Sequence, residues 1–378
     1  MTADQVIMDQ QDAQAPAMEI ATALQPLPEE PGEVHLAAHE MVGRRFLTPE
    51  GQEVIVTFVE SIPKYSDEGR LLGYTPHIDI VEDFTRLCDG PSPIRPAAMS
   101  PDRLEMTERN IRCNAGLVGK GLEGLPPRET VYVVGSGPSL MQNRHALERI
   151  DKDAAAVVGC NELLQYLPAG ILDYYAAIDA GCPSKWHSGI DVSRTTALIC
   201  TMAPSHFTLS PWRDLRWFKL RGQGGHVNLM EQCNPGLSEL SLSGYAVSLS
   251  MIEFAYRFLK ARTIVLAGFD FAYKYIDGIV YDHIDEPLSE DYWEGIYRMR
   301  GRIFARDIFG RPAVSDYNLL RAGMAVMGAI RCLADAGVRV INATEGGVLV
   351  PNEKCPAVIA GARHEVMPLE AVVETLNV

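Results

Sequence analysis

The stretch TVYVVGSGPSL, residues 130–140, decides the fold of this chain. The apolar run 131–134 is typical of a buried strand, and it enters a glycine-rich turn that a helix over 140–150 is predicted to follow. Glycines let the backbone approach an anion closely, while free amides and the helix dipole attract negative charge. The turn therefore indicates a phosphate-binding site, with a plain strand–helix turn as the alternative.

Short apolar segments alternate with helical ones after this turn. The predicted strands are 131–134, 154–158, 172–178, 197–201, 217–220, 263–267 and 338–341, and the later predicted helices are 244–260 and 317–336. Such alternation is typical of a parallel sheet with both faces covered. We therefore predict an α/β fold, a Rossmann-like doubly wound, mostly parallel sheet with helices on both faces.

The rest of the chain divides by composition. We predict a disordered acidic tail over 1–33, a small N-terminal region over 34–123, a nucleotide-binding catalytic domain over 124–350 and a C-terminal extension over 351–378. Within the small region, strand-like runs at 54–59 and 77–81 precede helical spacing over 101–123.

Composition excludes several classes of protein. The formal net charge of −15 disfavours general nucleic-acid binding. No apolar run reaches the roughly 20 residues of a membrane span, and the first residues do not form a secretory signal. The eight cysteines lie far apart without a CxxC pair, which favours reduced, mostly buried thiols over a zinc site. These features predict a cytoplasmic protein.

Polar residues stand where the predicted strands end. In such sheets ligands bind beyond the carboxyl ends of the strands, and a packed core needs no polar residue there. The residues concerned are Ser136, Asn161, Asp179, Asp270 and Asn342. This coincidence favours ligand binding at the turn, to which Gly135, Ser136, Gly137, Pro138 and Ser139 contribute backbone and hydroxyl groups.

The turn matches none of the common nucleotide or nucleophile motifs. It lacks the third glycine of GxGxxG, and it is neither a GxxxxGK[ST] loop nor a GxSxG elbow. At the end of the second strand, where an NAD enzyme usually places an acid for the ribose, this chain has Asn161 followed by Glu162. Nicotinamide chemistry is therefore disfavoured.

Three further features are candidate chemistry. Asp179 and Asp270 are expected to hold Mg²⁺ or ribose hydroxyls, or else to cap the following turns. His283, in a stretch rich in Tyr and Trp, has a suitable pKa for a general base, with a surface histidine as the alternative. The turn N342-ATEGG, which includes Asn342 and Thr344, is predicted to approach the ligand, or only to cap its strand.

Taken in order, these segments resemble the superfamily of the MptE-like 6-hydroxymethylpterin diphosphokinases, which includes the motility accessory factors and, remotely, bacterial CMP-sialic acid sialyltransferases. The motifs that carry the resemblance are VVGSGPSL at 133–140, GCNELL at 159–164, LSGYAVSLSMIEFA at 242–255, IVLAGFDFAY at 264–273 and NATEGG at 342–347. They span about 130 to 350 and leave the first 130 residues unmatched.

The resemblance implies two different site chemistries. In the sialyltransferase-like members the first turn, an Asn and a Ser-Gly pair hold CMP, and a later His is the base. The matching positions here are Gly137, Asn161, Ser243, Gly244 and His283. Asp179 departs from that pattern and, like the NATEGG turn, fits the diphosphokinase and motility-factor branches, where the diphosphokinases use Mg²⁺ and ATP.

Three functions follow from the sequence. The first is an MptE-like transferase that passes a diphosphoryl group from Mg²⁺–ATP to a hydroxyl of a small acceptor such as a pterin alcohol, with Asp270 and His283 in catalysis. The second is a glycosyltransferase that uses a nucleotide-activated sugar and a small-molecule or glycan acceptor. The third is a non-catalytic nucleotide- or sugar-binding accessory protein. The oligomeric state is left open.

Overall fold

The computed structural model describes most of the chain from residue 101 onward and parts of the region before it. The described residues are 25–26, 45–47, 53–65, 71–82, 101–221, 225–241, 247–276, 279–281, 287–289, 303–309, 311–315, 317–349 and 364–377. Most of the predicted tail, 1–33, and residues 351–363 lie outside them.

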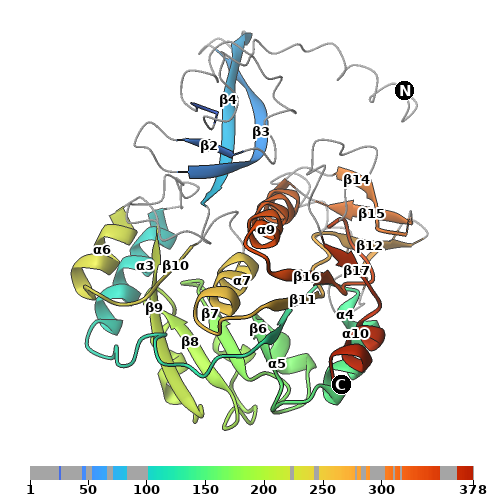
Figure 1. Cartoon of the computed structure of the whole chain (residues 1–378). Coiled ribbons are helices and arrows are strands. Elements are labelled where there is room, and N and C mark those ends of the chain that lie inside the picture. The colour runs from blue at the N-terminus through green and yellow to red at the C-terminus, as the bar shows by residue number, and fades with distance from the viewer. Residues whose placement is uncertain are drawn as a thin grey trace.

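A nine-stranded sheet forms the centre of the molecule (Figure 1). Its spatial order is β10-β9-β8-β7-β6-β5-β11-β16-β17, and all neighbouring strands pair in parallel. The strands are β5 (Thr130–Val134), β6 (Ala155–Cys160), β7 (Tyr174–Ala177), β8 (Thr196–Cys200), β9 (Asp214–Arg221), β10 (Glu239–Ser241), β11 (Thr263–Ala267), β16 (Arg339–Asn342) and β17 (Glu365–Val366). The predicted Rossmann-like fold is confirmed.

Both faces of the sheet are covered, as the apolar strands require. The residues of β5 alternate between two cores: Val131 and Val133 pack in one, and Tyr132 and Val134 pack in the other. The first core includes residues of α3 (Pro101–Asn114), α6 (Gly225–Cys233), α7 (Val247–Arg257) and α9 (Tyr317–Asp335). The second includes residues of α4 (Leu140–Asn143), α5 (Leu163–Tyr166), α10 (Leu369–Leu376) and the 3-10 segments η2 (Arg144–Arg149) and η4 (Ser205–Leu209).

Two predicted helices are shorter than expected. The helix predicted over 140–150 is one α-helical turn, α4, followed by the 3-10 segment η2, because Asn143 leaves the helical region at φ −121° and ψ 4°. The helix predicted over 101–123 ends at Asn114. The helix dipole at the Gly135–Leu140 turn is accordingly weaker than the sequence suggested, since only one turn of α-helix follows it.

Two antiparallel sheets flank the central one. The first consists of β1 (Gln25–Pro26), β2 (Arg45–Leu47), β3 (Glu53–Tyr65) and β4 (Leu71–Glu82), so the strand-like runs predicted at 54–59 and 77–81 are confirmed and are longer than expected. The second, in the order β13-β12-β15-β14, consists of β12 (Tyr273–Ile276), β13 (Ile279–Tyr281), β14 (Ile303–Arg306) and β15 (Pro312–Ser315). It lies between β11 and α9 in the chain and was not predicted.

The C-terminal segment belongs to the main domain. The predicted extension contains β17, which pairs with β16, and α10, which packs its residues Leu369 and Val372 into the second core. The cysteines of the described part form no disulfide with one another, and the predicted burial is confirmed for Cys160, Cys182, Cys200 and Cys332. Among the described helices, none is both long enough and apolar enough to cross a membrane.

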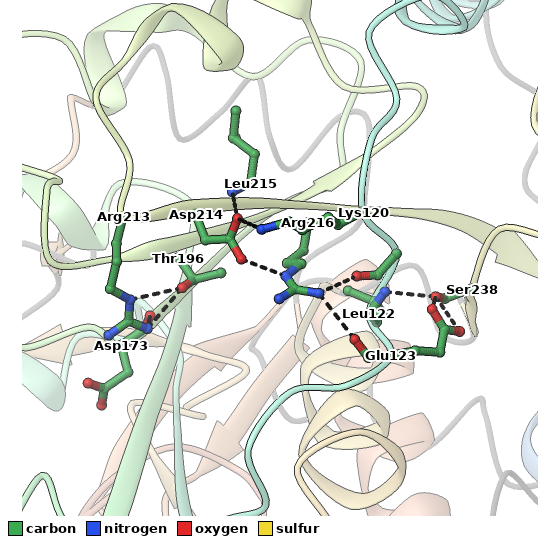
Figure 2. A network of polar contacts seen from close by, with 11 residues as sticks. Lys120, Leu122, Glu123, Asp173, Thr196, Arg213, Asp214, Leu215, Arg216 and Ser238 are labelled. Carbon is green, nitrogen blue, oxygen red and sulfur yellow. Dashed lines mark hydrogen bonds and ion pairs between the residues drawn. The ribbon is translucent and has the colours of Figure 1, made fainter.

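A polar network closes the amino-terminal edge of the sheet at β8–β10 (Figure 2). Arg216 of β9 donates from Nε to Asp214 at 2.8 Å and from Nη1 to the carbonyls of Gly121 and Glu123 at 3.2 and 3.1 Å. The Ser238 hydroxyl in turn donates to the Glu123 carboxylate at 2.7 Å. The segment that leads from α3 to β5 is thereby tied across this edge.

Helix α3 covers part of the opposite edge, at the carboxyl ends of β7 and β8. Asn110 donates to the carbonyls of Ala180 and Met202 at 3.2 and 3.0 Å. Asn114, which is fully buried, donates to two further carbonyls after β8 at 2.8 and 2.7 Å. These amides satisfy backbone groups that would otherwise be buried without partners, so α3 occupies this part of the edge.

Replacing Asn114 tests that covering role. Asn114→Leu keeps the size of the side chain but leaves two buried carbonyls without a donor, and we expect the free energy of unfolding to fall by about 2–4 kcal/mol. Urea unfolding followed by circular dichroism measures the loss. Arg112→Gln, an exposed change on the same helix, is the control and should change the free energy by less than about 0.5 kcal/mol. Equal stability of the two variants would contradict the role.

Candidate functional site

The Gly135–Leu140 turn lies where the strand order of the sheet reverses, between β5 and β11. The Gly137 amide donates to the Gly268 carbonyl at 2.9 Å. A Cβ atom on Gly135 would lie 2.6 Å from that same carbonyl, and one on Gly268, whose φ is +68°, would overlap the carbonyl of Gly135. The glycines therefore allow two backbones to touch, which side chains would prevent.

Asp270 fills the space next to this contact. Its side chain is buried at 4% exposure, and Oδ2 accepts a hydrogen bond from the Ser139 hydroxyl at 2.7 Å. The Ser139 amide donates to Oδ1 at 3.3 Å. The sequence predicted that Ser139 offers these groups to a ligand; in the structure the carboxylate of Asp270 takes both. A Cβ on Gly137 would overlap this carboxylate, which explains the second glycine of the turn.

Burial raises the pKa of Asp270 to about 7. The bonds from Ser139 act in the opposite direction, and the nearby carboxylate of Asp307 raises the pKa further. Desolvation dominates because a fully buried carboxylate loses more hydration than two donors replace. Asp270 is therefore a group that exchanges its proton near neutral pH, a property that clusters at functional sites.

A hollow opens beside Asp270. It is walled by Pro138 and Ser139 of the first turn, by β12, by the turn that enters β15 and by residues 345–347. It encloses about 550 Å³, a volume that includes solvent-open space at its mouth. The hollow thus borders the topological switch point, the place where open α/β sheets bind ligands.

Two cationic residues and two tyrosines of the small antiparallel sheet and its turn line this hollow. They are Lys274, Arg311, Tyr273 and Tyr275. Asp307 accepts Nε of Arg311 at 2.6 Å and the backbone amide of Arg311 at 2.8 Å, which orients the guanidinium group. Guanidinium, ammonium and phenol groups are typical ligands of phosphates and sugar hydroxyls. Apart from the density of tyrosines, the sequence held no signal for this wall.

The first residues of the NATEGG turn after β16 stabilise the fold, and its last residues line the hollow. The side chains of Asn342 and Thr344 are fully buried. Asn342 Oδ1 accepts the amide of Thr344, and Thr344 Oγ1 accepts the amide of Phe269, both at 3.1 Å. Neither side chain lines the hollow, and both hold the turn in place, which agrees with the alternative of a structural turn. The residues that line the hollow are Glu345, Gly346 and Gly347.

Asn161 and Asp179 lie at the same carboxyl edge of the sheet as the hollow, but neither residue lines it. Asn161 ends β6 with φ +55°, and its carbonyl accepts the hydroxyl of Tyr175 at 2.8 Å. The carboxylate of Asp179 accepts Nη2 of Arg103, from α3, at 2.6 Å on both oxygens. Helix α3 thus occupies Asp179 as well as the carboxyl ends of β7 and β8.

The structure does not bring Asp179 and Asp270 together. The strands that precede them, β7 and β11, have β6 and β5 between them, a separation of roughly 14 Å at the usual strand spacing. Within the described ranges, no group of three or more His, Cys, Asp or Glu side chains is arranged to hold a metal ion. Ser243, Gly244 and His283 lie outside the described residues, so their predicted roles stay predictions.

Comparison with known proteins gives one distant likeness. No family model matches the sequence, and no curated protein aligns with it significantly. Among solved structures, the MAf glycosyltransferase from Magnetospirillum magneticum AMB-1 is similar over 75% of this chain, with a TM-score of 0.47 and 13% identity. This chain corresponds to 42% of the length of that protein. The proposed resemblance to the MptE-like superfamily therefore rests on the quoted motifs alone.

The pKa of Asp270 predicts a pH dependence of stability. An unfolded aspartate ionises near pH 4 and the folded one near 7, so between these values the native state binds more protons than the unfolded state. Stability should therefore fall as the pH rises from 4 to 7, by an amount on the order of 4 kcal/mol for this group alone. Asp270→Asn should lose this contribution.

Urea unfolding of the wild type and of Asp270→Asn at a series of pH values measures the difference. Subtraction of the two curves removes the contribution of all other titrating groups. A difference that does not vary between pH 4 and 7 would contradict the raised pKa.

Proposed function

We propose that this chain is a transferase that binds a nucleotide-activated sugar in the hollow beside Asp270 and passes the sugar to a hydroxyl acceptor. The observation that carries the proposal is that Lys274 and the Asp307-anchored Arg311 line the same hollow as Asp270 and Ser139. These cations offer positive charge to the phosphates of a donor, and the tyrosines offer hydroxyls and rings to its sugar or base.

The same geometry disfavours diphosphoryl transfer as the first choice. That reaction was expected to use Asp179 and Asp270 as joint ligands of Mg²⁺–ATP, but Asp179 is paired with Arg103 and lies two strands farther along the sheet than β5. Asp270 alone, held by Ser139, offers fewer open oxygens than an octahedral ion requires. Binding of ATP that requires Mg²⁺ is therefore the alternative result for which the experiment below tests.

The cations that line the hollow, together with His283, have roles in the proposed reaction. The acceptor hydroxyl attacks the anomeric carbon of the sugar, and the bond to the donor phosphate breaks. Arg311 and Lys274 stabilise the negative charge that develops on the leaving phosphate, which is the usual electrostatic part of such catalysis. His283 is the proposed base that takes the proton of the acceptor hydroxyl, as its position in the sequence suggested.

A thermal-shift screen tests the donor. We expect one or more of CMP, CMP-sialic acid, and the UDP- and GDP-sugars to raise the unfolding temperature without Mg²⁺. Arg311→Gln should weaken the binding of that ligand at least tenfold, because it removes a phosphate-binding cation. Arg262→Gln, an exposed change at the opposite edge of the sheet, is the matched control. Stabilisation by ATP only, and only with Mg²⁺, would favour diphosphoryl transfer; no stabilisation by any nucleotide would exclude both transferases.

His283→Ala separates catalysis from binding. If His283 is the base, the variant should bind the nucleotide from the screen as tightly as the wild type, while sugar transfer falls by a factor of about 10² or more. Isothermal titration and a donor-hydrolysis or transfer assay measure the two quantities. Unchanged turnover in the variant would remove His283 from the mechanism, and binding without turnover in the wild type would favour the accessory-protein alternative.

A further inference from the structure

Glu345 joins the hollow to the C-terminal helix. Glu345 lines the hollow, and its φ of +60° lies in the left-handed region. Its side chain bonds to residues that do not line the hollow: Oε2 accepts Nδ2 of Asn143 at 2.5 Å and the amide of Leu369, the first residue of α10, at 3.1 Å. One carboxylate therefore holds three segments together, namely α4, the 345–347 turn and α10.

The left-handed backbone conformation of Glu345 determines where the next two residues pack. A non-glycine residue keeps a left-handed conformation only where surrounding contacts hold it. This conformation presses the next two glycines against the site: a Cβ on Gly346 would lie 2.9 Å from Oδ1 of Asp270, and one on Gly347 would overlap the Asp270 backbone. The position of Asp270 and the shape of the hollow therefore depend on how Glu345 is held.

Helix α10 also has contacts that do not involve the 345–347 turn. Leu369 and Val372 are fully buried, and Glu370 pairs with Arg149 of η2 at 3.1 Å and contacts His145 at 2.9 Å. The residue before the helix is Pro368, whose side chain makes no capping bond. The Glu345 carboxylate thus supplies the acceptor for the first turn of α10 from outside the helix, where negative charge is favourable.

We propose that Glu345 is a positioning residue, through which the C-terminal helix α10 sets the geometry of the hollow and its affinity for nucleotide. The part that concerns affinity rests on the proposed function, whereas the mechanical coupling does not. A carboxylate that served only as a cap for α10 would need no second bond to Asn143, which is 7% exposed and belongs to the segment that follows the Gly135–Leu140 turn.

Hydrogen exchange tests the coupling without any ligand. Glu345→Gly removes the carboxylate yet accepts the left-handed backbone, and Glu345→Gln keeps an acceptor oxygen. Glu370→Gln disturbs instead the contacts of α10 with His145 and Arg149. In Glu345→Gly we expect amide exchange to rise at least tenfold in peptides that cover 136–142, 345–349 and 369–376. Glu345→Gln should keep most of the protection, and Glu370→Gln should raise exchange in 369–376 and in η2 but not in 136–142 or 345–349. A rise confined to 369–376 in Glu345→Gly would overturn the proposal.

Nucleotide binding supplies the second readout, with CMP and UDP as probes. For whichever binds the wild type, we expect Kd to rise at least fivefold in Glu345→Gly and to stay within twofold in Glu345→Gln and Glu370→Gln. An unchanged Kd in Glu345→Gly would overturn the claim about affinity. If neither probe binds the wild type and the thermal-shift screen finds no other nucleotide, the proposed donor fails, and the exchange experiment alone still decides whether Glu345 couples α10 to the hollow.

Discussion

The rest of the structure depends on one close backbone contact, between Gly135 and Gly268 at the carboxyl ends of β5 and β11. Because neither residue has a side chain, the two turns meet at the switch point of the sheet and leave no open crevice between them. Asp270 then lies over Gly137, and its carboxylate takes the donors of Ser139. The place where a ligand phosphate would sit in a simpler fold is thus occupied by the protein itself, and the hollow lies beside it.

The burial of Asp270 gives this contact a chemical consequence. The cost of desolvation exceeds what two donors from Ser139 return, so the pKa rises to about 7. A carboxyl group with a pKa near 7 is partly protonated at neutral pH. Its neutral form does not repel an anion nearby, whereas its ionised form does. Two cationic residues of the small sheet and its turn, Lys274 and Arg311, line the same hollow. Acidic and cationic residues therefore border one space.

Different contacts cover the amino and the carboxyl edges of the central sheet. Side-chain amides of α3 bind the carbonyls after β7 and β8, and Arg216 with Ser238 ties the segment before β5 across the amino edge. Among the described residues, the part of the carboxyl edge that borders the hollow is the part near β5, β11 and β16. This division explains why Asp179, which ends a strand as Asp270 does, is an ion-pair partner of α3 and not a neighbour of Asp270.

The sequence by itself determined the parallel sheet, because each central strand is a short apolar run and its period differs from that of the helices that follow. It also drew attention to the Gly135–Leu140 turn and to Asp270, which the structure brings into contact at the switch point of the sheet. It did not reveal that the side chains of Asn342 and Thr344 are buried, that Asp179 pairs with α3, or that Arg311 and Lys274 line the hollow. Those outcomes depend on strand order and on contacts between residues far apart in the chain, here Asp179 with Arg103 and Asn143 with Glu345. Local patterns carry no information about such partners, so only the tertiary structure decided which strand-end residues share a site.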